Sequence, residues 1–179
     1  MNRDEMVHIP ESNGSVRLLG PVDVIGLKMT LQYYIDRALN HNVKQQGLRW
    51  AGDFEGVSDL RYNEANPKKI GEEDFVDWQS GTDVLQRIAK SLGIRDQGRV
   101  RMLMMLPRST YSFHHDPDLW RVHIPLVTNP DAFMVVDGKL WHLEVGNAYL
   151  VKVKDYHLAL NAGSENRIHI VFDWCDNLA

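Results

Sequence analysis

Apolar residues along this chain follow two different periods, and the change from one to the other divides the sequence into two parts. In the first part, Leu27, Leu31, Ile35 and Leu39 follow one another at helical spacing. This pattern predicts an amphipathic helix over about residues 27–43, whose apolar stripe packs on a core.

A second helix is expected shortly before the change of pattern. Thr82 or Ser80 can cap its first turn, and Gly93 can end it. Its apolar stripe consists of Val84, Leu85, Ile88 and Leu92. A short strand is expected over residues 16–20, before the first helix.

Residues 47–80, between the two predicted helices, are rich in Gly, Asp, Asn and Glu. This composition predicts a loop, with one short strand near residues 58–62. Long loops in compact domains often carry function, so this segment, which contains Trp78, is a candidate cover for a site.

After residue 98 the pattern changes to short apolar runs between turn signals. The first run is 99–106, and Asp137-Gly138 is a tight hairpin signal between two later runs. The further strand candidates are 111–115, 120–127, 132–136, 139–143, 147–153, 157–161 and 167–174. Many short strands after N-terminal helices predict a mainly β domain of jelly-roll type.

The composition fits one folded domain. At 179 residues and 20.6 kDa, the chain can bury about 70% of its unfolded surface in one core. A net charge of −4 disfavours nucleic acid or an anionic membrane as a partner. The polar N-terminus is unlike a signal peptide, and the lone Cys175 makes no internal disulfide. We therefore expect a soluble, cytoplasmic protein.

The first candidate for chemistry is the pair His114 and Asp116. Residues two apart on an extended strand point to the same side, so both side chains can face inward. His115 is then expected to face outward or to help position the site. Asp118 could compete with Asp116, but Pro117 makes a loop begin after Asp116.

His157, at the start of a later strand, can complete a set of two imidazoles and one carboxylate. This requires the two strands to be antiparallel neighbours. Such a set on one side of a metal, with open positions left over, suits a non-haem Fe(II) oxygenase, and the missing cysteine ligands disfavour structural zinc. Asp155 is a second candidate ligand, ranked below Asp116.

Arg167 lies ten residues after His157, at the head of a mostly apolar strand. If its guanidinium is buried, it needs an anionic partner. A dicarboxylate ligand would supply one, because arginine grips a carboxylate in a bidentate manner. The alternative is an exposed arginine at a strand end.

Arg121 and His123 share one face of the strand 120–127, and the apolar residues of that strand share the other. If the apolar set faces an outer core, Arg121 and His123 face the barrel interior, where they can hold a second carboxylate. The alternative for His123 is an ordinary buried histidine. The histidines without a pattern, which we expect to be structural, are His8, His41, His142 and His169.

The order of these motifs resembles the aspartyl/asparaginyl β-hydroxylase family of Fe(II)/2-oxoglutarate-dependent dioxygenases, which also includes free-proline hydroxylases. The resemblance covers about residues 80–174. Its pieces are RVRMLMMLP at 99–107, H-x-D at His114/Asp116, RVHIPLVTN at 121–129, the D-G hairpin, GNAYLV at 146–151, H-x3-N at His157/Asn161 and RIHIVFD at 167–173. The segment GNAYLVKV departs from the commoner Gly-Glu-aromatic start, and the first 80 residues match only loosely.

The resemblance implies a double-stranded β-helix, cupin-like in topology, with iron held by His114, Asp116 and His157. It implies that Arg167 binds the distal carboxylate of 2-oxoglutarate, and that Arg121 and His123 contact carboxylates of the co-substrate or substrate. It further implies a hydroxylase that uses Fe(II), 2-oxoglutarate and O2. Its substrate would be an amino acid, free or as an Asp-, Asn- or Pro-like residue in a peptide or protein.

On this interpretation residues 1–179 form a single domain. About 1–98 provide helical and loop support, and about 99–174 form the catalytic β-helix core. Two alternatives stay open, namely a non-catalytic cupin-like domain that binds a metal or small ligand, and an isomerase that needs no O2.

Overall fold

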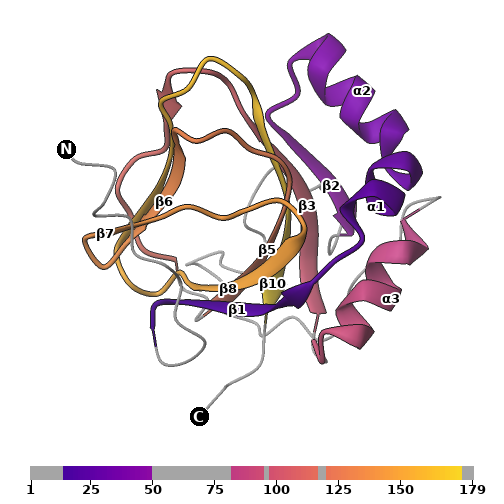
Figure 1. Cartoon of the computed structure of the whole chain (residues 1–179), viewed down its shortest axis with the longest axis horizontal. Helices are drawn as coiled ribbons and strands as arrows, with labels where there is room; N and C mark the ends of the chain where they lie inside the picture. The colour runs from indigo at the N-terminus through magenta and orange to yellow at the C-terminus, as the bar shows by residue number, and fades with distance from the viewer. Residues whose placement is uncertain (1–13, 50–81, 95–96, 117–119, 175–179) are drawn as a thin grey trace, which may run out of the picture.

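The computed structural model describes residues 14–49, 82–94, 97–116 and 120–174 (Figure 1). Its first part contains β1 (Val16–Pro21), α1 (Val24–Thr30), α2 (Gln32–His41), β2 (Gln45–Arg49) and α3 (Asp83–Ser91). Its second part contains β3 (Gln97–Met105), β4 (Ser109–Thr110), β5 (Trp120–Val127), β6 (Ala132–Val136), β7 (Lys139–Trp141), β8 (Asn147–Lys152), β9 (His157–Asn161) and β10 (Arg167–Trp174).

The strands form two antiparallel sheets that face each other, with the helices on the outer side of the larger one (Figure 1). Among the described residues, the larger sheet has six strands in the order β1-β8-β5-β10-β3-β2, and the smaller has four in the order β4-β9-β6-β7. This arrangement is the double-stranded β-helix, or jelly roll, so the predicted fold class is confirmed. The N-terminal strands β1 and β2 supply both edges of the larger sheet.

The predicted helix over 27–43 is two helices, α1 and α2, that meet at Leu31. It begins earlier than predicted because the Asp23 side chain accepts a hydrogen bond from the Gly26 N–H and caps the first turn. The helix predicted after Thr82 is confirmed as α3, and Gly93 follows it with φ 74°, a conformation that glycine adopts without strain.

The predicted runs 120–127, 132–136, 157–161 and 167–174 are confirmed as β5, β6, β9 and β10. The hairpin signal is also confirmed, because Asp137 and Gly138 both have positive φ, at 50° and 71°, and join β6 to β7.

The prediction of a strand over 111–115 is wrong. Pairing is regular only at Ser109–Thr110, and His114 forms an isolated bridge with His157. Sequence reasoning also missed β2, whose last residues fall in the segment predicted as loop from residue 47. The predicted strand near 58–62 and Trp78 lie outside the described residues.

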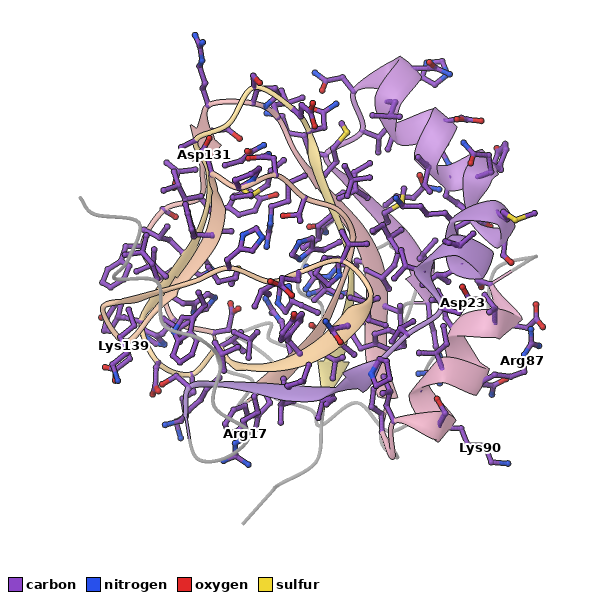
Figure 2. All side chains as sticks on the ribbon, viewed as in Figure 1. Arg17, Asp23, Arg87, Lys90, Asp131 and Lys139 are labelled. Carbon is purple, nitrogen blue, oxygen red and sulfur yellow. The ribbon has the colours of Figure 1, made fainter. Side chains whose placement is uncertain are left out.

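The larger sheet has an apolar outer face and a polar inner face. Side chains of β3, β5 and β10 alternate, so that Val122, Ile124, Ile170 and Phe172 pack against the helices in the main core. A smaller cluster between the sheets includes Met134, Val136, Tyr149 and Val151. In Figure 2 many nitrogen-bearing side chains point into the barrel. Within the described part of the chain, every helix is too short or too polar to cross a membrane.

Candidate metal centre

The structure brings His114, Asp116 and His157 together at one point inside the barrel. One ligand atom from each side chain can be chosen so that all lie within 4.8 Å of one another, and the three form a group that could hold a metal ion. Two backbone hydrogen bonds hold the segments side by side. The His114 N–H donates to the His157 carbonyl at 3.0 Å, and the His157 N–H donates to the His114 carbonyl at 2.7 Å.

Both imidazoles are oriented by backbone carbonyls. Nδ1 of His114 lies 2.6 Å from the Ser112 carbonyl, and Nδ1 of His157 lies 2.9 Å from the Asp155 carbonyl. Because a carbonyl can only accept, each Nδ1 carries a proton, so in the neutral form of either ring Nε2 is the nitrogen with the lone pair. This is the tautomer that a metal-binding histidine needs.

Asp116 is the carboxylate of the group and is nine-tenths buried. Its backbone N–H donates to the Val153 carbonyl at 2.9 Å, which fixes the residue beside the end of β8. Burial raises the pKa of Asp116, but the contact with His157 and the charge of Arg121 outweigh it and lower the pKa to about 2. The carboxylate is therefore ionised and ready to act as a ligand.

These residues fit a metal that prefers mixed nitrogen and oxygen ligands. Nε2 of His157 lies 3.5 Å from Asp116 Oδ2, and Nε2 of His114 lies 3.9 Å from Asp116 Oδ1, so the two imidazoles flank the carboxylate. Oδ2 of Asp116 lies 2.6 Å from Nη1 of Arg121 but accepts no well-directed hydrogen bond from the described residues, so this oxygen keeps a lone pair for an ion. Two histidines and one carboxylate suit non-haem Fe(II).

Arg167 is at the start of β10 and is only 3% exposed. Its guanidinium donates to the thioethers of Met105 and Met134, both at 3.3 Å, and to Nδ1 of His169 at 3.1 Å. Burial lowers its pKa to about 10, and the influence of Tyr111 acts in the opposite direction. No carboxylate of the described residues contacts Arg167. Because its side chain is buried, the alternative of an exposed arginine at a strand end does not hold.

Arg121 and His123 point to the inner face of β5, as their phase predicts, while the apolar residues of β5 face the helices. The Arg121 guanidinium is paired with Asp116. Burial, and then the positive charge of Arg167, lowers the pKa of His123 well below its usual value. His123 is therefore neutral at physiological pH.

His169, predicted to be structural, lies beside these residues. It is buried, and its Nδ1 is 3.4 Å from Nδ1 of His123. Because Arg167 can only donate, Nδ1 of His169 is an acceptor, so Nδ1 of His123 is the donor between the two rings. The signal that could have found His169 is its position two residues after Arg167 on the same strand face.

Three more polar residues in this region escaped sequence reasoning. Arg99 and Arg101 line one cavity together with the His114/Asp116/His157 group, and Asp173 is fully buried between the two arginines. The available signal was alternation, since Arg99 and Arg101 are two residues apart on β3 and Asp173 keeps the phase of Arg167 on β10. Both runs are also rich in apolar residues, which hides this signal.

The other candidate ligands lie away from the cluster or outside the described residues. His115 is exposed and packs edge-on against Tyr156, as its outward phase predicts. The Asp155 carboxylate pairs with Lys152 at 3.0 Å. Asp118 and Pro117 are outside the described residues.

The His114/Asp116/His157 group, Arg121 and His123 border one cavity of about 380 Å³. Arg167, Met134 and Tyr111 line it together with the His–Asp–His group, and Leu103, Val153, Ala159 and Val171 give it apolar walls. A cavity of this size accepts a small ligand beside the metal position.

Fold and site together define a double-stranded β-helix protein with a His–Asp–His group and a buried arginine in its interior. Residues 78–176 match the family described as Aspartyl/Asparaginyl beta-hydroxylase. The match spans more than half of the chain, which therefore belongs to this family.

Two solved structures share the fold over nearly the whole chain. AviO1 from Streptomyces viridochromogenes Tue57 is 18% identical, with a TM-score of 0.56 over 92% of this chain and 90% of that one. An oxidoreductase of the 2OG-Fe(II) oxygenase family from Burkholderia pseudomallei is 13% identical, with a TM-score of 0.50 over 93% and 92%. No curated protein matches the sequence.

Proposed function

We propose that this protein is an Fe(II)/2-oxoglutarate-dependent dioxygenase that hydroxylates an amino acid, free or as a residue in a peptide or protein. One observation carries the proposal. A single cavity contains both the His114/Asp116/His157 group and a buried Arg167 that no described carboxylate neutralises. The first suits Fe(II), and the second suits a dicarboxylate. Family membership supports both assignments.

Fe(II) with 2-oxoglutarate and O2 would supply the oxidising power, so that one oxygen atom enters the substrate C–H bond and the other enters succinate, with release of CO2. His114 and His157 would offer Nε2 lone pairs, and Asp116 would offer its carboxylate. Together these three residues would hold the ion.

Arg167 would hold the distal carboxylate of the keto acid. Its present partners, two thioethers and one imidazole, are weak acceptors for a guanidinium, so an incoming carboxylate forms much stronger charge-assisted hydrogen bonds. The apolar walls of the cavity would keep water from the reacting atoms and hold the substrate C–H bond near the metal position.

The central test is substrate-stimulated turnover of 2-oxoglutarate. The protein is loaded with Fe(II) and 2-oxoglutarate without oxygen, O2 is admitted, and succinate is measured across a panel of amino acids and peptides. We expect at least one member of the panel to raise succinate above the His114→Ala control, with a product heavier by one oxygen atom. Succinate at the control level throughout would contradict the proposal and favour a binding domain or an O2-independent isomerase.

A second test concerns Arg167. Loss of a hydrogen bond to a charged group costs about 1.5–3 kcal/mol, so Arg167→Ala should raise the 2-oxoglutarate concentration required by at least about tenfold. Arg108→Ala, at an exposed position outside the cavity, is the matched control. An unchanged requirement in Arg167→Ala would remove this residue from the site.

A further inference from the structure

Asp173, near the end of β10, is fully buried and lies among three arginines. It accepts hydrogen bonds from Arg99 Nε and Arg101 Nη2, each at 3.1 Å, and pairs with Arg121 Nε at 2.8 Å. These arginines come from β3 and β5, the two strands that flank β10.

The strand register explains why one carboxylate meets all three arginines. Asp173 is directly opposite Arg121 in the β5–β10 pairing, so the two side chains emerge on the same inner face. On the other side, the β10–β3 register shifts between Phe172 and Trp174, at the level of Arg99. This bulge brings an additional β3 residue opposite Asp173.

Arg121 extends this cluster to the metal position. While its Nε faces Asp173, its Nη1 lies 2.6 Å from Oδ2 of Asp116. Both contacts are ion pairs without full hydrogen-bond geometry. Because a guanidinium is planar and rigid, an ion pair at its Nε edge limits the directions that Nη1 can take. Arg121 therefore connects the Asp116 carboxylate to a fully buried acid on β10.

We propose that Asp173 is the positioning residue for the carboxylate ligand of the metal and acts through Arg121. The chain of contacts is Asp173 to Arg121 to Asp116, and it connects a fully buried acid to the carboxylate ligand through one guanidinium. This inference rests on the proposed function only in taking Asp116 as a ligand. Partners of this kind commonly change metal affinity by 10–100-fold when they are removed.

The experiment measures Mn(II) binding to the full chain by electron paramagnetic resonance, without co-substrate or turnover. Asp173→Asn and Arg121→Gln should each weaken Mn(II) binding by about 10–100-fold. Asp131→Asn makes the same chemical change at an exposed position at the rim of the barrel, and we expect it to bind as the native protein does (Figure 2).

Two further variants separate positioning from a merely structural role. If Asp173 acts through Arg121, Asp173→Asn combined with Arg121→Gln should bind Mn(II) no more weakly than Arg121→Gln alone. Asp173→Glu, which keeps the charge, should recover part of the affinity and of the native spectrum. Fully additive losses would overturn the proposal, as would affinity in folded Asp173→Asn within about twofold of the Asp131→Asn control.

If Asp173→Asn does not fold, Arg121→Lys decides, because lysine keeps the charge but cannot span two carboxylates with a planar fork. Native affinity in Arg121→Lys would overturn the proposal. The native protein and His114→Ala distinguish the two levels of failure. If both bind Mn(II) equally or not at all, the metal site itself is wrong. If the native protein binds Mn(II), His114→Ala does not, and the Asp173 and Arg121 variants bind as tightly as the native protein, then only the positioning role is wrong.

Discussion

The two faces of the six-stranded sheet are built from the same strands but have opposite chemistry. On the outer face, Ile124, Ile170 and Phe172 pack against the helices in an apolar core. On the inner face, Arg121, Arg167 and His169 are also buried, although each is polar. Burial on the outer face stabilises the fold, whereas burial of charge on the inner face costs stability and prepares a site for ligands.

The largest effect is expected on the outer face. Ile170→Ala should lower the free energy of unfolding by ~2–5 kcal/mol, because Ile170 is fully buried and the change leaves a cavity. Urea denaturation measures this loss, and Mn(II) affinity of the folded protein should stay within about twofold of native, since the side chain faces away from the cavity.

Ile25→Ala is the control for this prediction, because Ile25 is 76% exposed and should change stability by no more than ~0.5 kcal/mol. Similar losses in both variants would show that the outer face is not the main source of stability.

The second prediction is that a substitution on the inner face raises the free energy of unfolding. Arg167→Met replaces a buried cation, which no described carboxylate neutralises, by an apolar side chain of similar length. We expect the free energy of unfolding without ligands to rise by ~1–4 kcal/mol, as is seen when buried charges give way to apolar groups. Binding of 2-oxoglutarate should be lost in the same variant.

The measurement is urea denaturation with and without 2-oxoglutarate, compared with Lys154→Met at an exposed position. A less stable Arg167→Met protein would mean that the thioether and imidazole contacts fully offset the free-energy cost of burying the Arg167 charge.

The third prediction concerns the pH dependence of the inner face. Burial, followed by the charge of Arg167, lowers the pKa of His123 and His169 well below 6.5. Below about pH 6.5 the unfolded chain takes up protons that the folded protein does not, so stability falls as the pH is lowered from there toward the folded pKa values. Each histidine contributes up to ~1.4 kcal/mol per pH unit.

In His169→Gln the difference between the unfolding free energies near pH 7.5 and pH 5.5 should shrink accordingly. The same change at exposed His41 should leave the difference as in the native protein. An unaltered difference in His169→Gln would show that this histidine titrates normally in the fold.

The fourth prediction concerns a turn that belongs to neither face. Gly138 has φ 71° with open space around its Cβ position, so Gly138→Ala should cost ~1–2 kcal/mol from backbone strain alone. Gly138→Asn should cost less, because asparagine tolerates this conformation better. Mn(II) affinity should be unchanged in both, and a large loss of affinity would show that the β6–β7 hairpin shapes the site.

The sequence by itself determined most of the elements and, for β5, the side of the strand that carries chemistry. Alternation in β5 predicted that Arg121 and His123 face inward, and the structure places them there. Helical spacing, the Asp137-Gly138 turn and the short β runs are local signals, which depend on neighbours a few residues away and so can be read from the chain.

Only the tertiary structure decided which distant side chains meet. Asp173 looked like the end of an apolar strand, and its role depends on a register shift and on two strands from elsewhere in the chain. His169 was predicted to be structural, because the sequence does not show that β10 places it beside His123 and Arg167. Contacts of this kind are fixed by strand order and register, which are settled by the packing of the whole barrel rather than by any local pattern.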